Sequence, residues 1–378
     1  MKVSCLQENL AKALSTVARA VPSRPSEDIL LNILLRTEEG RLRLTATNLE
    51  LAITVWVGAK VEEEGGIAVP AQRLRDFVAQ LPPERVDLSS VQRPLGIQVS
   101  CAWLKAMLRG VEAETYPPLP TVKEGTTALV SQKALGRAIE QVAFAAATDE
   151  SRPILTGIRT ELEGERFTMA AADGFRLAVH TGTLAQPVET PVGVVVPAKT
   201  LKEVANLLED SEEPVTLHIA RDGSGILFRL KGVEVYSHLL QGTFPNFRQL
   251  IPQSSQTRAV LDCQRLLQTV KAGSAFARTG SNIVRILLEP GTPGKVTVLA
   301  GMEEEGSASG ELEASIEGEP ARIAFNSRYL QDVLSVIGGE KVSMGVNTPS
   351  SPGVFRPIGG EASPEYVHVV MPMFVQWP

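Results

Sequence analysis

The chain has no long hydrophobic run and very few cysteines. No stretch of about 18 apolar residues occurs in it, which excludes a helix of the usual membrane-spanning kind. The N-terminal MKVSCLQENL lacks the apolar region of a secretory signal peptide. Cys5, Cys101 and Cys263 are far apart, odd in number and form no CxxC, so we expect reduced structural thiols. These absences predict a cytoplasmic protein without membrane association.

The motifs of the common enzyme classes are also missing. The sequence contains no GxxxxGK[ST], no strand–GxGxxG–helix and no GxSxG. Its four histidines, His180, His218, His238 and His368, are scattered without metal-ligand spacing. We therefore expect no catalytic residue, no metal and no cofactor. The alternative from another class, a hydrolase or transferase on tandem α+β domains, would need a polar catalytic constellation that the sequence does not show.

The chain does contain one pattern of residues that is repeated three times. Helix-like amphipathic runs occur at 6–17, 130–142 and 262–272, and a second shared phrase follows at 67–78, 194–205 and 323–334. Leu74, Leu201 and Leu330 occupy matching places in the second phrase, spaced by 127 and 129 residues. Because this period is far longer than that of solenoid repeats, it indicates three tandem domains of one architecture.

Each repeat reads as helix, strands, helix, strands. Alternating apolar residues such as RLRLTAT, with turns at EEG (38–40), EGER (163–166) and ADGF (172–175), predict antiparallel hairpins. Few helices against much sheet indicate an α+β fold. The Pro-containing segments 115–126 and 243–256 are typical of linkers. We therefore predict domains at 1–125, 126–253 and 254–378.

The predicted helices carry basic residues opposite their apolar stripes. Net charge is −6, yet none of the seven helix positions tested opposite the apolar stripes is acidic. These positions are Gln72, Lys199 and Arg328 in the second helices, and Lys12, Lys133, Arg137 and Arg265 in the first. The acidic excess lies in turns and strand ends, at Glu62–Glu64, Glu209–Glu213, Glu303–Glu305 and Glu311–Glu319. The bias favours a basic surface for an anionic partner, whereas for any single residue a solvated helix face is the simpler interpretation.

The whole chain resembles the bacterial DNA polymerase III beta subunit, the replicative sliding clamp. The resemblance rests on SRPSEDIL (23–30), LTATNLELAI (44–53), KAMLRGVEAETYPPLP (105–120), SRPILTGI (151–158), AADGFRLAV (171–179), VVVPAKTL (194–201), GTFPNFRQLIP (242–252) and VVMPM (369–373). It implies three tandem clamp domains per chain, with helices packed on antiparallel sheets. Two chains would close head to tail into a six-domain ring that encircles duplex DNA without reading its sequence. An adaptor that binds peptides without encircling DNA is the other non-enzymatic alternative, and ring closure separates the two.

The resemblance also implies site residues. Arg24, Arg152 and Lys199 match basic positions that contact DNA in the family, and Arg73, Arg137 and Arg328 complete the predicted DNA-binding set. The predicted partner-peptide pocket consists of Leu155, Gly174, Phe175, Arg176, Leu177, Pro245, Leu250, Val369, Met371 and Met373. Its implied partners are the DNA polymerase III alpha subunit, the clamp loader complex, and other polymerases and repair factors. From apolar residues flanked by charge in the first and last repeats, we predict a homodimer interface at Met107, Leu108 and Phe276.

Overall fold

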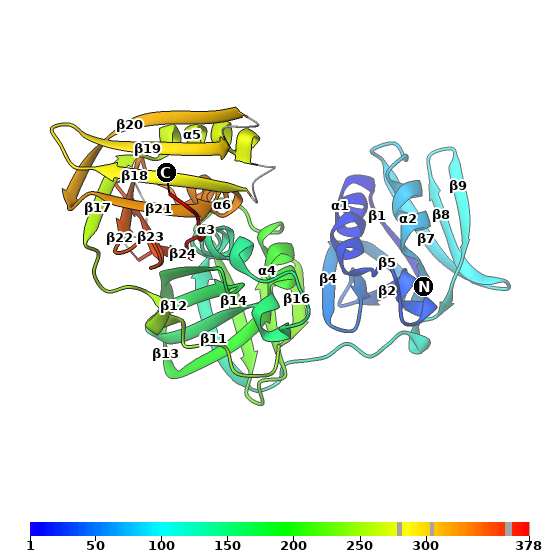
Figure 1. Cartoon of the computed structure of the whole chain (residues 1–378). Helices are drawn as coiled ribbons and strands as arrows, with labels where there is room; N and C mark the ends of the chain where they lie inside the picture. The colour runs from blue at the N-terminus through cyan, green and yellow to red at the C-terminus, as the bar shows by residue number, and fades with distance from the viewer. Residues whose placement is uncertain (278–281, 303–305, 360–364, 378) are drawn as a thin grey trace. The chain divides into compact units, whose positions relative to one another are not determined.

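A computed structural model describes residues 1–277, 282–302, 306–359 and 365–377 (Figure 1). The predicted acidic run Glu303–Glu305 lies outside the described residues. The described part contains six α-helices, two in each repeat, at the places that the repeated phrases predict. By contacts, the chain divides into two compact units: 1–132 with 206–239, and 133–205 with 240–378. The unit boundaries therefore fall inside the second repeat, and the predicted domain limits stay a prediction.

The elements of the first repeat follow the expected order after one strand, β1 (Lys2–Leu6), that the sequence pattern did not predict. Its helices are α1 (Gln7–Val17) and α2 (Ala71–Val78), with the 3₁₀ turns η1 (Ala18–Ala20), η2 (Asp28–Leu31) and η3 (Ala113–Thr115). Its strands are β1 (Lys2–Leu6), β2 (Asn32–Glu38), β3 (Arg41–Thr47), β4 (Leu51–Gly58), β5 (Lys60–Glu63), β6 (Gly66–Pro70), β7 (Arg85–Gln92), β8 (Leu95–Cys101), β9 (Leu104–Arg109) and β10 (Val111–Glu112).

The second and third repeats keep this order with some strands fused. The second has β11 (Gly125–Ser131), α3 (Gln132–Val142), η4 (Ala143–Ala145), η5 (Pro153–Thr156), β12 (Gly157–Ala172), β13 (Arg176–Pro197), α4 (Ala198–Ala205), β14 (Pro214–Ala220), β15 (Gly225–Leu230), β16 (Val233–His238) and η6 (Phe247–Leu250). The third has β17 (Thr257–Asp262), α5 (Cys263–Ala277), β18 (Ile283–Glu289), β19 (Gly294–Met302), β20 (Gly306–Gly318), β21 (Ala321–Asn326), α6 (Ser327–Val336), β22 (Lys341–Val346), β23 (Gly353–Ile358) and β24 (Val367–Val370).

Antiparallel sheets form the body of each unit. The first unit contains a five-stranded sheet, β5-β1-β7-β8-β9, and a nine-stranded sheet, β10-β6-β2-β3-β4-β16-β15-β14-β11. The second contains a ten-stranded sheet, β12-β13-β24-β23-β22-β17-β20-β19-β18-β21. Two of these sheets join strands from different repeats, so the repeats are not independent beads on a chain.

The helices pack by the stripes that the periodicity predicts. Leu74, Leu201 and Leu330 in the second helices are fully buried, as are Leu10 and Leu14 of α1. Burying one leucine side chain contributes about 2 kcal/mol relative to leaving it in water. The matched leucines of the repeated phrase are thus core residues, which is why the phrase recurs.

Two equivalent joints connect the sheets of successive repeats. At the first joint β4 pairs with β16, and Leu51 lies opposite Ser237. At the second joint β13 pairs with β24, and Arg176 lies opposite Val370. Strand pairing across a joint satisfies backbone groups that would otherwise form an exposed sheet edge. Each joint is therefore continuous sheet rather than a contact of side chains alone.

The two joints also share one register. Asn48 Oδ1 accepts a hydrogen bond from the N–H of Leu51, and Asp173 Oδ1 accepts one from the N–H of Arg176, so both pairing strands begin three residues after the same kind of turn. Beyond the paired residues each joint adds one matching backbone hydrogen bond of 2.8 Å, from His238 N–H to the Glu50 carbonyl and from Met371 N–H to the Phe175 carbonyl. The repeats are thus joined by one geometry used twice.

Buried polar side chains connect the second and third repeats at the second joint. Gln141 of α3 donates from Nε2 to the carbonyls of Val336 and Ile337, both at 3.1 Å. Its Oε1 lies 2.7 Å from His180 Nδ1, and its carbonyl accepts a 3.0 Å hydrogen bond from the Tyr366 hydroxyl. Because a buried polar group without a partner is costly, this network favours one arrangement of the joint.

Candidate functional site

One face of the sheet at the second joint forms an apolar floor. Ala172, Leu177 and Val369 come from β12, β13 and β24 and lie side by side in register. All three are buried, and Leu155 from η5 packs into the same cluster. Three of the predicted pocket residues, Leu155, Leu177 and Val369, thus meet in one place.

A segment that we call the cover segment, residues 240–252, lies over this floor. Phe244 and Phe247 belong to the same apolar cluster, with Leu240 and Ile251 packed against it at the edge. Between these anchors Pro245 is exposed, and Leu250 is 51% exposed. The cover segment therefore fixes its aromatic side chains inward and holds the two predicted pocket residues at the surface.

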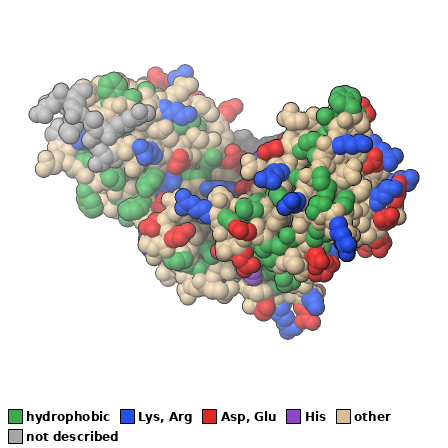
Figure 2. Space-filling view, turned by 90° about the vertical axis from the view of Figure 1, so that its right-hand side faces the viewer, with side chains coloured by type: hydrophobic (Ala, Val, Ile, Leu, Met, Phe, Trp, Pro, Cys, Tyr) green, Lys and Arg blue, Asp and Glu red, His purple; other side chains and the backbone are tan. Residues whose placement is uncertain are grey.

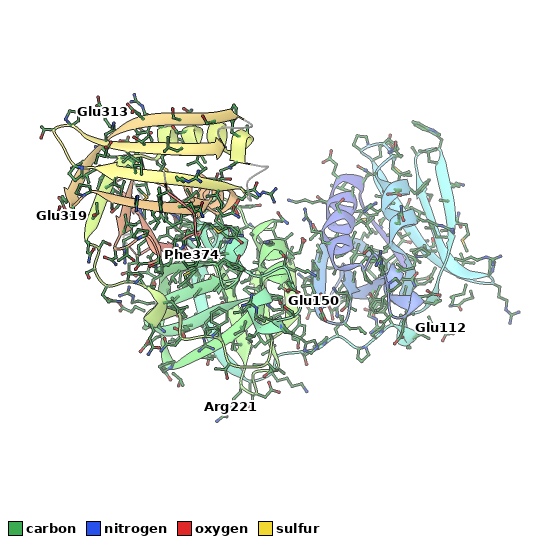
Figure 3. The ribbon with its side chains drawn as sticks, in the orientation of Figure 1. Glu112, Glu150, Arg221, Glu313, Glu319 and Phe374 are labelled. Carbon is green, nitrogen blue, oxygen red and sulfur yellow. The ribbon has the colours of Figure 1, made fainter. Side chains whose placement is uncertain are left out.

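Further apolar side chains stand at the rim. Phe175 is 56% exposed and stacks on Tyr329, with ring centroids 6.5 Å apart. Met371 is 42% exposed, and Met373 is half-buried. Phe374, labelled in Figure 3, is 88% exposed. Exposed large apolar side chains around an apolar floor are typical of a surface that binds apolar side chains of another molecule.

The turn between β12 and β13 is held by Asp173 and Arg152. Asp173 Oδ1 accepts hydrogen bonds from the N–H groups of Phe175 and Arg176, at 2.9 and 3.0 Å. Gly174 has φ +93°, and a Cβ there would lie 2.8 Å from Arg152 Nη1. Arg152 Nη2 donates to the Asp173 carbonyl at 2.8 Å. The predicted tight turn is confirmed, and Arg152 lies against it, beside the pocket residues.

Arg176 connects this turn to the third repeat. Its Nε donates to Asp173 Oδ2 at 3.0 Å, its Nη1 to Asp332 Oδ2 at 2.5 Å and its Nη2 to the Phe144 carbonyl at 2.6 Å. The guanidinium also lies over the Tyr329 ring, 4.6 Å from its centroid. The hydrogen bonds of the Arg176 guanidinium thus stabilise the joint. Through them Arg176 positions its neighbours Phe175 and Leu177, which belong to the predicted pocket.

The predicted DNA-binding residues differ in their surroundings. Four of them have exposed side chains: Arg24, Arg73, Lys199 and Arg328. Arg137, by contrast, is half-buried, and a Cβ on Gly338 would lie 3.3 Å from its Nη2. The helical period places Arg137 opposite the stripe of its own helix, but the turn after α6 covers that side. On the face shown in Figure 2, charges of both signs are intermingled.

The predicted dimer residues lie beside hollows at sheet edges. Met107 is 45% exposed and Leu108 is buried on β9, the edge strand of the five-stranded sheet. A hollow of about 430 Å³ between α2 and β9 is lined by Met107, Leu108 and Phe77. In the other unit Phe276 is 46% exposed, and a Cβ on Gly306 would lie 3.8 Å from its ring. Nearby, a hollow of about 300 Å³ separates α5 from the start of β20.

Sequence reasoning missed four residues that position the predicted pocket residues. Phe244 and Phe247 anchor the cover segment, and Tyr329 and Asp332 of α6 hold Phe175 and Arg176. The aromatic residues stand in the GTFPNFRQLIP segment, whose alternation of aromatic and polar residues signals anchoring. Tyr329 and Asp332 carried no such signal, because their contacts are made between repeats.

Potential metal ligands are dispersed over the part of the chain that the structure describes. Over the described ranges, no group of three or more potential metal ligands lies together. His180 and His368 are buried, and burial lowers the pKa of His180 to about 4 and that of His368 to about 3. Among the helices that the structure describes, none is both long and apolar enough to cross a membrane.

Comparison with known proteins identifies the family. The N-terminal, central and C-terminal domain models of the DNA polymerase III beta subunit match residues 1–120, 129–246 and 248–374. The beta sliding clamps of Synechococcus elongatus and Streptomyces coelicolor are each 32% identical, over 99% of both chains. The sliding clamp structure of Bacillus subtilis matches with TM-score 0.93 and 27% identity over 100% of both chains. A Pseudomonas aeruginosa sliding clamp bound to griselimycin matches with TM-score 0.92 and 27% identity, over 99% of this chain and 100% of that one.

The matches cover all three repeats and agree with the two helices on antiparallel sheet found in each. Three tandem clamp domains are thus the architecture of this protein. The chain belongs to the DNA polymerase III beta subunit family, the sliding clamps, which are processivity factors without catalytic activity of their own.

Proposed function

We propose that two copies of this chain close head to tail into a ring of six domains around duplex DNA, and that the pocket at the second joint tethers replication proteins to it. The observation that carries ring closure is the repeated joint. β4–β16 and β13–β24 use the same strands of the repeat in the same register. A repeated head-to-tail contact generates a ring when its rotation closes.

The ends of the triplication offer the strands for a further joint. β9 is the first-repeat counterpart of β16 and β24, and it forms an edge of its sheet. The first part of β20, from Gly306 to Gly310, pairs with β19 alone among the described strands, whereas β17 pairs only with the later part. Pairing β9 of one copy with the start of β20 of the other would repeat the internal joints and remove both edges.

The apolar residues at these two places support the same closure. Met107 is exposed in the hollow beside β9, and Phe276 is exposed on α5, so burying each against the partner copy would remove apolar surface from water. Arg73 and Arg109 also line the hollow beside β9. In a closing contact Arg109 would meet carboxylates of the acidic third repeat and help set the orientation of the two chains.

The DNA partner is inferred from charge and from the ring. Four exposed cations belong to the proposed set: Arg24, Arg73, Lys199 and Arg328. Two further members are Arg137, which is half-buried, and Arg152, which donates a hydrogen bond to the Asp173 carbonyl. Cations of this kind bind phosphates and carry no sequence information. We therefore expect sequence-independent contact with duplex DNA, and a cytoplasmic location, since all relatives named above are bacterial.

The pocket provides the tether. We assign it the DNA polymerase III alpha subunit, the clamp loader complex and other polymerases and repair factors that carry short clamp-binding motifs. Leu250, Phe175 and Met371 offer the exposed apolar surface that a short peptide needs. Methionines adapt to several partners. A polymerase held this way rebinds the DNA end at high effective concentration instead of diffusing away.

The closure is tested by mass. Met107→Asp would bury an unpaired charge at the proposed interface and cost about 3–5 kcal/mol of association. Light scattering at micromolar concentration should give wild type twice the 40.6 kDa of the chain and the variant a single chain mass.

Leu250→Asp provides the matched control, since it places the same charge on a similarly exposed apolar residue away from β9. It should keep the double mass and lose peptide binding. A dimeric Met107→Asp variant would remove the proposed interface. A wild-type protein with the mass of a single chain would exclude the ring and leave the alternative of an adaptor that binds peptides without encircling DNA.

A further inference from the structure

A second hollow continues the apolar floor of the pocket. Val179 and Val367 lie opposite each other, two residues along from the Leu177–Val369 pair on the same strands and face. The hollow has a volume of about 440 Å³. Its lining residues are Glu161, Glu163, Arg166, Thr168, Val179, Thr181, Phe247, Arg248, Ile251, Glu365 and Val367.

The floor of this second hollow is apolar, and Phe247 and Ile251 of the cover segment form one side of it. Phe247 and Val179 thus belong both to the cluster under the pocket and to the lining of the hollow. A chain segment lying in the pocket would reach the hollow within about two residues, because an extended chain advances roughly 3.3 Å per residue.

Ion pairs form its walls. Arg166 pairs with Glu365, and Arg248 pairs with Glu161 at 2.6 Å. The Arg248 guanidinium also lies 4.8 Å from the Phe247 ring centroid. Both arginines of the lining are therefore matched by a carboxylate.

Glu163 is the charge left over. It is exposed at the lip of the hollow, next to Gly164 of β12, and has no ion-pair partner among the described residues. The lining carries three carboxylates and two guanidiniums, and Arg159, just outside it, pairs with Glu161 at 3.1 Å. An apolar floor with an unpaired carboxylate at its lip matches a side chain with an aliphatic stem and a cationic end.

We propose that this hollow binds a lysine or arginine that flanks the apolar anchors of a partner's clamp-binding segment. The stem lies on Val179 and Val367, and the cation faces Glu163. The inference rests on the proposed pocket, and it adds a charge preference that the apolar floor of the pocket does not supply. An acidic residue at the same place would meet the unpaired carboxylate and bind less well.

Fluorescence anisotropy with labelled peptides tests this assignment. The probes are the pentapeptide Gln-Leu-Ser-Leu-Phe and versions extended at either end by Ala-Lys, Ala-Glu or Ala-Ala. On the wild-type protein the Ala-Lys extension at one end should bind roughly twofold to fivefold more tightly than Ala-Glu at that end, as expected for one exposed ion pair. The preference should shrink at high salt.

Variants assign the preference to the hollow. Glu163→Gln should abolish the lysine preference and Glu163→Lys should reverse it, while the unextended pentapeptide keeps its affinity in both. Glu165→Gln is the matched control, because Glu165 is exposed two residues further along β12 but does not line the hollow. An unchanged preference in Glu163→Gln, or no preference at either end, would overturn the inference. Failure of the unextended pentapeptide to bind wild type would instead overturn the pocket itself.

Discussion

His180 and His368 are buried polar side chains at the second joint. His180 shares a hydrogen bond with Gln141, whereas neither ring nitrogen of His368 has a hydrogen-bond partner among the described residues. The His368 ring lies 5.4 Å from that of Phe144, centroid to centroid. Burial lowers the pKa of both, and the neighbouring Arg137 and Arg176 lower it further. Both imidazoles are therefore neutral in the folded protein near pH 7.

This neutrality makes stability depend on pH. In the unfolded chain each histidine binds a proton below its ordinary pKa of about 6.5, whereas in the folded protein His180 does so only near 4. The unfolded state thus holds more protons, and stability falls as pH drops from 6.5 toward 4, by about 1.4 kcal/mol per pH unit for each histidine. Urea unfolding of wild type and His180→Gln between pH 7 and 5 measures it. The variant should lose stability less steeply, and parallel curves would contradict the assignment.

At the scale of elements, the sequence predicts what is local. The second helix of each repeat follows from the 3.6-residue stripe around Leu74, Leu201 or Leu330, and the first helices follow from the amphipathic runs at 6–17, 130–142 and 262–272. The Asp173 turn follows from Asp-Gly between apolar runs. The joints could not be predicted, because no local period shows that β4 pairs with β16 or β13 with β24. The same reason hides Asp332 and Tyr329, which contact Arg176 from another repeat. It also hides the partial burial of Arg137.

The proposed pocket is formed by residues from several helices, strands and loops, and substitution of Met371 tests it. Leu177 lies in the core, so its truncation would disturb the fold, whereas Met371 is partly exposed and its side chain is dispensable for the joint. Met371→Ala should weaken binding of the Gln-Leu-Ser-Leu-Phe peptide by about 1–2 kcal/mol, from the lost apolar contact.

Anisotropy titration measures the effect, and Phe374→Ala, three residues along the same segment and 88% exposed, is the control. A larger loss in Phe374→Ala than in Met371→Ala would move the pocket toward the end of the chain.

For the whole molecule, the proposed ring predicts how DNA is held. Replacing Arg24, Lys199 and Arg328 with Glu should weaken retention on circular duplex DNA. The slope of log affinity against log salt should fall by roughly 0.9 for each phosphate contact removed. Sequence preference should stay absent, and the fold should persist, since these side chains are exposed.

The control makes the same change of charge elsewhere, at Lys60, Arg221 and Lys295. Each of these three already has an ion-pair partner on its own surface, and Arg221 is labelled in Figure 3. Retention and salt slope equal to wild type in the first triple variant would exclude its three residues from the DNA contact. An equal loss in both triple variants would mean that net charge, rather than position, sets retention.

The shared register of the two internal joints has a consequence for how such a ring comes apart. Each internal joint lies beside a covalent connection, since residues 113–124 lead from the first repeat to the second and 239–256 from the second to the third. If the strands of such a joint separate, the chain keeps them within reach and they pair again. The joint between two chains has no such covalent connection. If strand pairing is equal at every joint, dilution and mechanical strain separate only the two joints between chains. The proposed ring would therefore open at those two joints, while the four joints within the chains stay closed.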